Sequence, residues 1–65
     1  MSAHQGTVKF FNHENGFGFI TPSDGSKDVF VHKNNVEGHI NDGDAVSYDV
    51  EQTDKGLSAL RVHQS

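Results

Sequence analysis

The sequence has no cysteine and no tryptophan, one proline, and only five lysines and arginines against nine acidic residues. Without cysteine there is no disulfide framework and no thiolate zinc site. The same absence fits a reducing compartment. No apolar run approaches the roughly 18 residues of a membrane-spanning helix, and the polar first six residues do not resemble a signal peptide. We therefore expect a soluble, cytoplasmic protein without membrane contact.

Residue patterns for catalysis or cofactor binding are also missing. The five histidines, at positions 4, 13, 32, 39 and 63, are too far apart to share a local ligand motif, so a metal site would need histidines from distant segments. There is no glycine-rich phosphate loop and no nucleophile arrangement. Asp28 and His32 share one strand face, but that face is expected to be shallow and wet, with no reason for tuned acid–base groups. We predict no enzyme, cofactor, metal or small-molecule substrate.

Turn-forming residues divide the chain into short apolar runs. Glycine with asparagine or aspartate recurs at 15–16, 24–25, 41–44 and 54–56, where such residues favour tight turns. The intervening runs are rich in valine, isoleucine, phenylalanine and threonine, as strands are. The expected strands cover residues 5–12, 16–21, 28–32, 45–51 and 57–63, with at most one helical turn in 33–38. At this length the chain forms one domain, 1–65, with an ordered core of about 5–63.

Five short strands predict an all-β fold, either an antiparallel barrel or a sandwich, and a barrel leaves fewer exposed edges. Alternation of side chains along each strand then separates an inner from an outer face. The predicted aliphatic core is Val8, Ile20, Val29, Val31, Val46, Val50, Leu60 and Val62, with Val36 and Ile40 closing one end.

Three phenylalanines fall on the face opposite to this core. Phe17, Phe19 and Phe30 would cluster with His32 on the outer surface of two adjacent strands. The plain alternative is a second half of the core, and Phe19 in particular could be half buried, but the chain has no spare segment to cover the rings. Exposed apolar patches of this kind mark binding sites.

Unpaired bases fit such a surface, since base–aromatic stacking contributes about 1–3 kcal/mol per base. A formal net charge of −4 is unusual for a nucleic-acid binder. Stacking would supply affinity that charge does not, while Lys9, Lys33 and Lys55 reach phosphates. Duplexes would be poor partners because their bases are already stacked. Lys33 and Lys55 are equally well explained as solvated surface lysines.

The motifs resemble those of bacterial cold-shock proteins over nearly the whole chain. Residues 6–12, GTVKFFN, resemble the opening strand of that family. Residues 15–20, NGFGFI, resemble its first ribonucleoprotein motif, and residues 29–32, VFVH, match its second. The resemblance implies a five-stranded Greek-key barrel of the OB-fold class that binds single-stranded RNA and DNA with modest sequence preference.

Carried over residue by residue, the resemblance implies a stacking surface and a set of polar contacts. The stacking residues are Phe10, Phe17, Phe19, Phe30 and His32. The polar contacts are Lys9, Asn12, Asp28 and Lys55, to which Lys33 adds a phosphate contact; Asp28 is alternatively a residue that orients its neighbours. Strict alternation separates Lys9 from Phe10, so a β-bulge or a strong twist in the first strand is expected, with Phe11 in the core or at its rim. Tyr48 is expected in the core or rim, outside the patch.

The sequence departs from the family pattern in ways that reduce the expected grip on a strand. Phe10 replaces the usual tryptophan, Asn15 a lysine and Lys33 a phenylalanine. The segment 37–42 is short and lacks the customary aromatic residue, for which His39 is the one candidate substitute. We expect fewer bases to be bound, and more weakly, than in a typical member.

Two functions remain after these exclusions. The first is sequence-tolerant single-strand binding, which the resemblance extends to an RNA chaperone and a regulator of transcription or translation in cold or stress. The second is a protein-interaction module whose phenylalanine patch docks a peptide or a second copy. We expect a monomer, with a strand-swapped dimer through the short segment 37–42 as the alternative.

Overall fold

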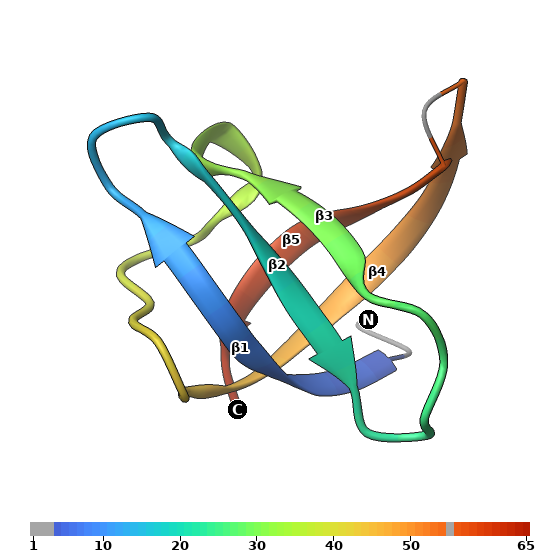
Figure 1. The fold of residues 1–65 in the computed structure, drawn as a ribbon. Helices are drawn as coiled ribbons and strands as arrows, with labels where there is room; N and C mark the ends of the chain where they lie inside the picture. The colour runs from blue at the N-terminus through green and yellow to red at the C-terminus, as the bar shows by residue number, and fades with distance from the viewer. Residues whose placement is uncertain (1–3, 55) are drawn as a thin grey trace.

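A computed structural model describes residues 4–54 and 56–65, which form a closed five-stranded barrel (Figure 1). The five predicted strands are all present, with ends within two residues of the expected bounds. They are β1 (His4–Asn12), β2 (Phe17–Pro22), β3 (Val29–His32), β4 (Ala45–Thr53) and β5 (Gly56–Gln64). The predicted helical turn is the 3-10 helix η1 (Lys33–Asn35). Among the described residues, no helix is long and apolar enough to span a membrane.

The strands follow the order β1-β2-β3-β5-β4, and β4 closes the barrel by pairing with β1. Four of the five pairings are antiparallel, as predicted, whereas β3 and β5 run parallel. The parallel pair arises because the chain does not turn directly from β3 into its neighbour. It crosses one end of the barrel through η1 and the following segment to start β4 beside β1, and β5 then returns alongside β3 (Figure 1).

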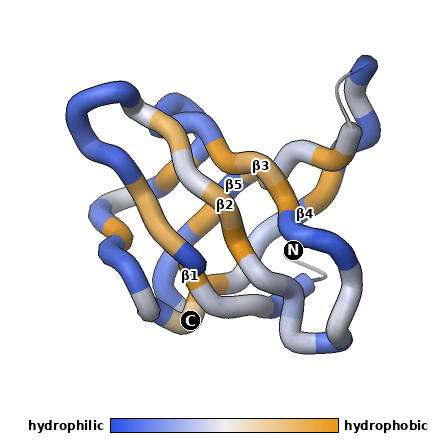
Figure 2. The backbone as a smooth tube through the Cα atoms, in the orientation of Figure 1, coloured by the Kyte–Doolittle hydropathy of each residue, from blue (hydrophilic) through white to orange (hydrophobic). Residues whose placement is uncertain are grey.

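The interior is a single apolar cluster, and most hydrophobic residues lie on the strands while the tight turns are hydrophilic (Figure 2). Val8, Ile20, Val29, Val31, Val46 and Val62 are buried as predicted, and Ile40 and the half-buried Val36 close one end. Phe11, Tyr48 and Ala59 complete the core. The hydroxyl of Tyr48 is buried as well, and it has no hydrogen-bond partner within the described part of the chain.

Two predicted core positions are wrong in detail. Val50 is only half buried and packs against the core from the side, where the β4–β5 hairpin leaves the barrel (Figure 1). Leu60 is also half buried because Arg61 adopts a left-handed conformation, with φ at 53°. At this bulge β5 holds one residue more than β4, which shifts the register between the two strands. Ala59 and Val62 therefore both point inward, and Leu60 does not.

The bulge predicted in the first strand is confirmed. Val8 pairs with Ile20 and Phe10 with Phe19, so β1 holds one residue more than β2 over this interval. The irregularity leaves both Lys9 and Phe10 exposed and returns Phe11 to the core. Gly18 faces this site: a Cβ there would overlap the carbonyl oxygen of Phe10 and lie 2.8 Å from the Cα of Phe11. Close approach of the two backbones therefore requires glycine.

Candidate nucleic-acid interface

Strand register brings the predicted aromatic residues together on the outside of β1, β2 and β3. One row across these strands consists of Phe10, Phe19 and Phe30, and a second consists of Asn12, Phe17 and His32. The residues between the rows, Phe11, Gly18 and Val31, are buried. We call the outward-facing set the aromatic platform: Phe10, Phe17, Phe19, Phe30 and His32.

The phenylalanine rings of the platform contact one another. Ring centroids are 5.6 Å apart for Phe10 and Phe19, 5.8 Å for Phe19 and Phe30, and 6.0 Å for Phe17 and Phe30. Phe10 is 38% exposed and the other three are half buried. Mutual packing restricts the rotamers of each ring before any ligand arrives, which lowers the conformational entropy lost on binding.

Lys9 and Asp28 form an ion pair at the edge of the platform. The Nζ of Lys9 lies 3.1 Å from Oδ2 of Asp28, and the Oγ1 of Thr21 donates to Oδ1 of Asp28 at 3.3 Å. Both side chains of the ion pair remain partly exposed. In this geometry Asp28 orients Lys9, the alternative role that the sequence left open for it.

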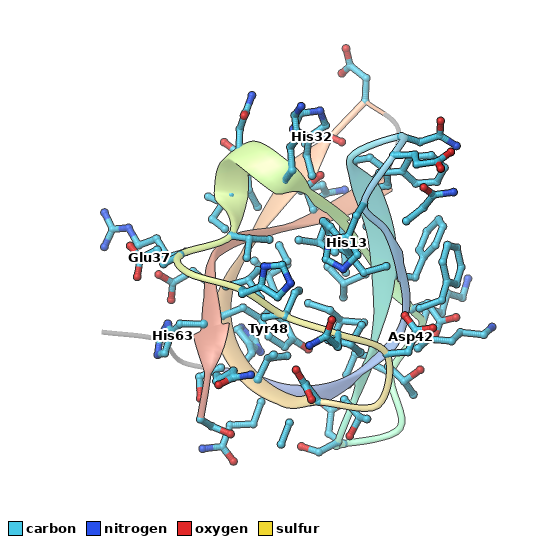
Figure 3. All side chains as sticks on the ribbon, turned by 90° about the vertical axis from the view of Figure 1, so that its left-hand side faces the viewer. His13, His32, Glu37, Asp42, Tyr48 and His63 are labelled. Carbon is cyan, nitrogen blue, oxygen red and sulfur yellow. The ribbon has the colours of Figure 1, made fainter. Side chains whose placement is uncertain are left out.

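Asn12 and His32, at the two ends of the second row, fasten the turns that follow their strands. The Oδ1 of Asn12 accepts hydrogen bonds from the backbone N–H groups of Glu14 and Asn15, at 2.9 and 3.0 Å. The Nδ1 of His32 accepts from the backbone N–H of Asn34 at 3.2 Å, so the neutral ring carries its proton on Nε2. His32 projects from the start of η1 (Figure 3). Each side chain is thereby held in place beside Phe17.

Lys33, the first residue of η1, is held against the β1–β2 turn. Its backbone N–H donates to the carbonyl of Gly16 at 2.8 Å, and a Cβ on Gly16 would lie 2.8 Å from the Cδ of Lys33. Gly16 also has a φ of 78°, a conformation that L side chains rarely adopt. The Lys33 stem thus lies next to the platform. Lys55, the remaining predicted contact, lies outside the described residues.

Leu57 was not among the predicted site residues, and its side chain is 42% exposed. It lines a surface hollow of 280 Å³ together with Phe19, Phe30, Thr53 and Ser58. Since Phe30 pairs with Ser58 of β5, this hollow continues the platform across the parallel strand pair. The available signal was an apolar leucine directly after the turn glycine Gly56.

Comparisons with known proteins agree with this geometry. Residues 4–65 match the family model described as the "Cold-shock" DNA-binding domain. The chain is 46% identical over 66 residues to the cold shock-like protein CspC of Buchnera aphidicola, covering 95% of this chain and 96% of that protein. It is 52% identical over 61 residues to the cold shock-like protein CspJ of Salmonella typhimurium, covering 88% and 87%.

Solved structures show the same fold. The barrel resembles drosophila Unr CSD456 with a TM-score of 0.78 and 26% identity over 95% of this chain, which spans 26% of that longer chain.

Proposed function

The chain belongs to the cold-shock domain family, whose members bind single-stranded nucleic acids and are not enzymes, and on that premise we propose that it binds single-stranded RNA and DNA by stacking bases on the aromatic platform. The observation that carries the proposal is the pair of rows that puts four phenylalanines and a histidine on one outer face of three strands. No described segment covers this face, and each stacked base contributes about 1–3 kcal/mol.

The individual residues take distinct roles in this proposal. Phe10, Phe17, Phe19 and Phe30 stack on bases, and His32 stacks or donates from Nε2. Lys9 and Lys33 contact phosphates, and Lys55 is proposed for the same role at the hairpin. Asn12 contacts the strand through its amide while its Oδ1 holds the turn. Asp28 orients Lys9, and the exposed Leu57 extends the apolar surface.

Binding without catalysis is sufficient for an RNA chaperone. A protein that binds only unpaired strands stabilises them by RT ln(1 + [L]/Kd), so abundance compensates for modest affinity and no nucleotide hydrolysis is needed. We infer that the protein acts in this way in the cytoplasm, as one domain and as a monomer. A role in regulating transcription or translation under cold or stress follows the same mechanism.

Charge distinguishes this mode of binding from ordinary phosphate-dominated binding. The net charge of −4 opposes a polyanion at long range, and only a few lysines border the platform. Each phosphate contact contributes about 0.7 to the dependence of log K on log salt for a single strand. We expect a slope of roughly 1–2, consistent with two or three contacts.

Fluorescence anisotropy of a labelled oligothymidine, titrated at low and moderate salt, tests the proposal. We expect binding to the single strand, little binding to a duplex of the same length, and the shallow slope given above. The label must sit on the nucleic acid because the chain has no tryptophan. Equal affinity for the duplex, or a steep slope, would refute stacking as the main source of affinity.

A pair of variants separates binding from folding. Phe30→Ala should reduce single-strand affinity by more than tenfold, as expected for one lost stacking contact, with a smaller effect on stability. Val62→Ala, inside the barrel, should lower stability and leave affinity unchanged at temperatures where it is folded. If Phe30→Ala instead lowers stability with affinity intact, Phe30 is a core residue and the platform is misassigned.

The exposed Leu57 and Phe10 favour one competing function, a surface that docks a peptide or a second copy of the chain. Competition separates the two: an oligonucleotide should displace nothing from such a surface if bases do not bind there. Absence of any oligonucleotide binding, together with self-association that Leu57→Ser abolishes, would favour the protein-interaction function.

A further inference from the structure

His13 and His39 stack face to face although they are distant in the sequence. Their ring centroids are 4.9 Å apart with an interplanar angle of 9°, and Phe11 meets His13 edge-on at 5.0 Å. His13 belongs to the turn after β1, and His39 to the segment that crosses the end of the barrel between Glu37 and Asp42 (Figure 3). Parallel stacked rings do not direct two nitrogens at one metal ion, so the pair calls for another explanation.

The two histidines border a surface hollow of 190 Å³ that has an apolar floor and a basic rim. Phe11, Val36 and Ile40 contribute to the floor, and Val36 and Ile40 belong to the same end of the core. His13, His39 and Lys33 stand around it. We call this the histidine hollow. Three nitrogen-bearing side chains from three separate segments thus converge on one small space.

The histidine hollow adjoins one end of the aromatic platform. Asn12, Phe17 and His32 form the row at that end. His13 directly follows Asn12 in the chain and Lys33 directly follows His32. A nucleic-acid strand stacked on Phe17 and His32 would therefore direct its next phosphate past Lys33 toward the hollow. The stacking proposal assigns no contact to the hollow itself.

Acidic groups near the hollow are largely engaged elsewhere. The Oδ1 of Asp42, on the crossing segment, accepts the backbone N–H of Phe11 at 2.8 Å, and Glu37 lies 4.0 Å from the Nδ1 of His63. Glu14 follows His13 in its exposed turn. Lys33 adds a positive charge on the η1 side. An anion entering the hollow thus meets Lys33 and the two imidazoles, with Glu14 and Asp42 at the periphery.

We propose that the histidine hollow is an acid-activated phosphate site, which His13, His39 and Lys33 form together once the imidazoles are protonated. Imidazoles in general gain a proton between about pH 8 and 5. Two stacked imidazolium rings repel each other, and a phosphate that accepts from each ring through a different oxygen offsets that repulsion. With all five histidines charged, the formal net charge changes from −4 to +1, so long-range repulsion of a polyanion also disappears.

The phosphate is either a backbone phosphate of a bound strand or a free phosphate ion, and the former rests on the proposed function. Binding and protonation are linked reciprocally, so a ligand preferring the charged pair also makes the pair easier to protonate. The site therefore predicts single-strand affinity that rises on acidification, together with histidine titrations that respond to the ligand.

Anisotropy titrations of oligothymidine at about pH 8 and about pH 6 test the strand-bound case. We expect roughly three- to tenfold tighter binding at the lower pH, with the salt slope steeper by about 0.7. Because the platform carries a third imidazole, that of His32, the decisive variant is His13→Asn/His39→Asn, which should lose most of this gain and bind normally at about pH 8. His63→Asn, beside Glu37, is the matched control and should retain the gain.

Histidine NMR titrations provide a second readout that needs no change in sequence. With oligothymidine or inorganic phosphate added, the His13 and His39 curves should shift to higher pH while the His4 curve stays in place. If inorganic phosphate shifts the two curves and oligothymidine does not, the site binds the free ion. If neither ligand moves the two curves, or the double variant keeps the full pH effect, the inference is wrong. Absence of strand binding at both pH values would instead refute the proposed function.

Discussion

The ammonium group of Lys9 lies 3.1 Å from the carboxylate of Asp28, so a cation beside the aromatic platform is already paired with an acid. The pair joins β1 to the segment before β3, because Lys9 alternates outward from the buried Val8 and Asp28 immediately precedes β3. A phosphate that contacts Lys9 must compete with this carboxylate. The ion pair holds Lys9 in position but weakens the attraction between Lys9 and a nucleic-acid phosphate.

Asp28→Asn should therefore strengthen binding. Neutralising the acid releases Lys9 and removes a negative charge near the strand, and we expect a two- to fivefold gain in oligothymidine affinity with a steeper salt slope. Stability should change little, since exposed ion pairs contribute about 0–1 kcal/mol. Lys9→Gln is the counterpart and should weaken binding. A weakened Asp28→Asn variant would mean that the carboxylate itself accepts a hydrogen bond from a base.

Gly18→Ala should be among the most destabilising small substitutions in the barrel. The added Cβ would overlap the Phe10 carbonyl, and two paired backbones cannot separate without breaking the ladder. We expect a loss of about 3 kcal/mol or more in the free energy of unfolding, measured by urea denaturation. Gly25→Ala has open space but a φ of 83°, so it should lose only about 1–2 kcal/mol. Equal losses would show that sterics at Gly18 do not matter.

Arg61→Asn should stabilise the protein. A left-handed conformation costs an L residue about 1–2 kcal/mol, and asparagine tolerates it better than arginine does. We expect a gain of about 0.5–1 kcal/mol, or several degrees in Tm for a domain of this size. Arg61→Ala keeps a Cβ without the tolerance of asparagine and serves as the control. A gain in Arg61→Ala as large as in Arg61→Asn would indicate that the arginine side chain, rather than φ, is unfavourable.

Tyr48→Phe should also be stabilising, for a different reason. The Tyr48 hydroxyl is buried without a partner among the described residues, and such groups cost about 1–3 kcal/mol. His4 stacks over the ring at 5.9 Å, a contact that phenylalanine keeps. Thermal denaturation should show a higher Tm for Tyr48→Phe. A lower Tm would reveal a hydrogen bond to water or to another group.

The same hydroxyl predicts a pH dependence at alkaline pH. Burial, with the charge of Asp24 as a second cause, raises the pKa of Tyr48 above its ordinary value of 10. The fold therefore favours the neutral phenol, and this contribution to stability is complete below pH 10 and is lost as the pH rises through the folded-state pKa. Since Tyr48 is the only tyrosine, phenolate absorbance reports it alone. Tyr48→Phe should lack this part of the alkaline loss; an identical alkaline profile would contradict the assignment.

Local patterns in the sequence were sufficient to predict the barrel and most of the platform. Alternation placed Phe17, Phe19 and Phe30 outside, whereas the irregularity in β1 was predicted only because the family resemblance put Lys9 and Phe10 on the same face. Arg61 could not be predicted in the same way, because arginine carries no preference for the left-handed region that its bulge requires. Leu60 was consequently assigned to the wrong face. One extra residue therefore decides which side chains face outward in β1, where the prediction was right, and in β5, where it was wrong.

Contacts between distant segments were beyond prediction. His13 and His39 meet only because the segment after η1 folds back across the turn that follows β1, which no local pattern encodes. No sequence pattern indicated that Asn12 and His32 accept hydrogen bonds from the backbone that follows them, whereas the orienting role of Asp28 was one of its two expected roles. Each of these three polar side chains holds part of the site in place through its intramolecular hydrogen bonds, in addition to its predicted contact with a ligand.

The parallel pairing of β3 with β5 determines when the protein can become functional during its synthesis. β5 is the last strand to be translated, yet it pairs with both β3 and β4, and its Ser58 lies beside Phe30. While β5 remains in the ribosomal tunnel, the edges of β3 and β4 are unpaired and the apolar interior is open. Folding must therefore wait until β5 has left the tunnel, and a nascent chain that already carries every platform phenylalanine still lacks the surface that they form together.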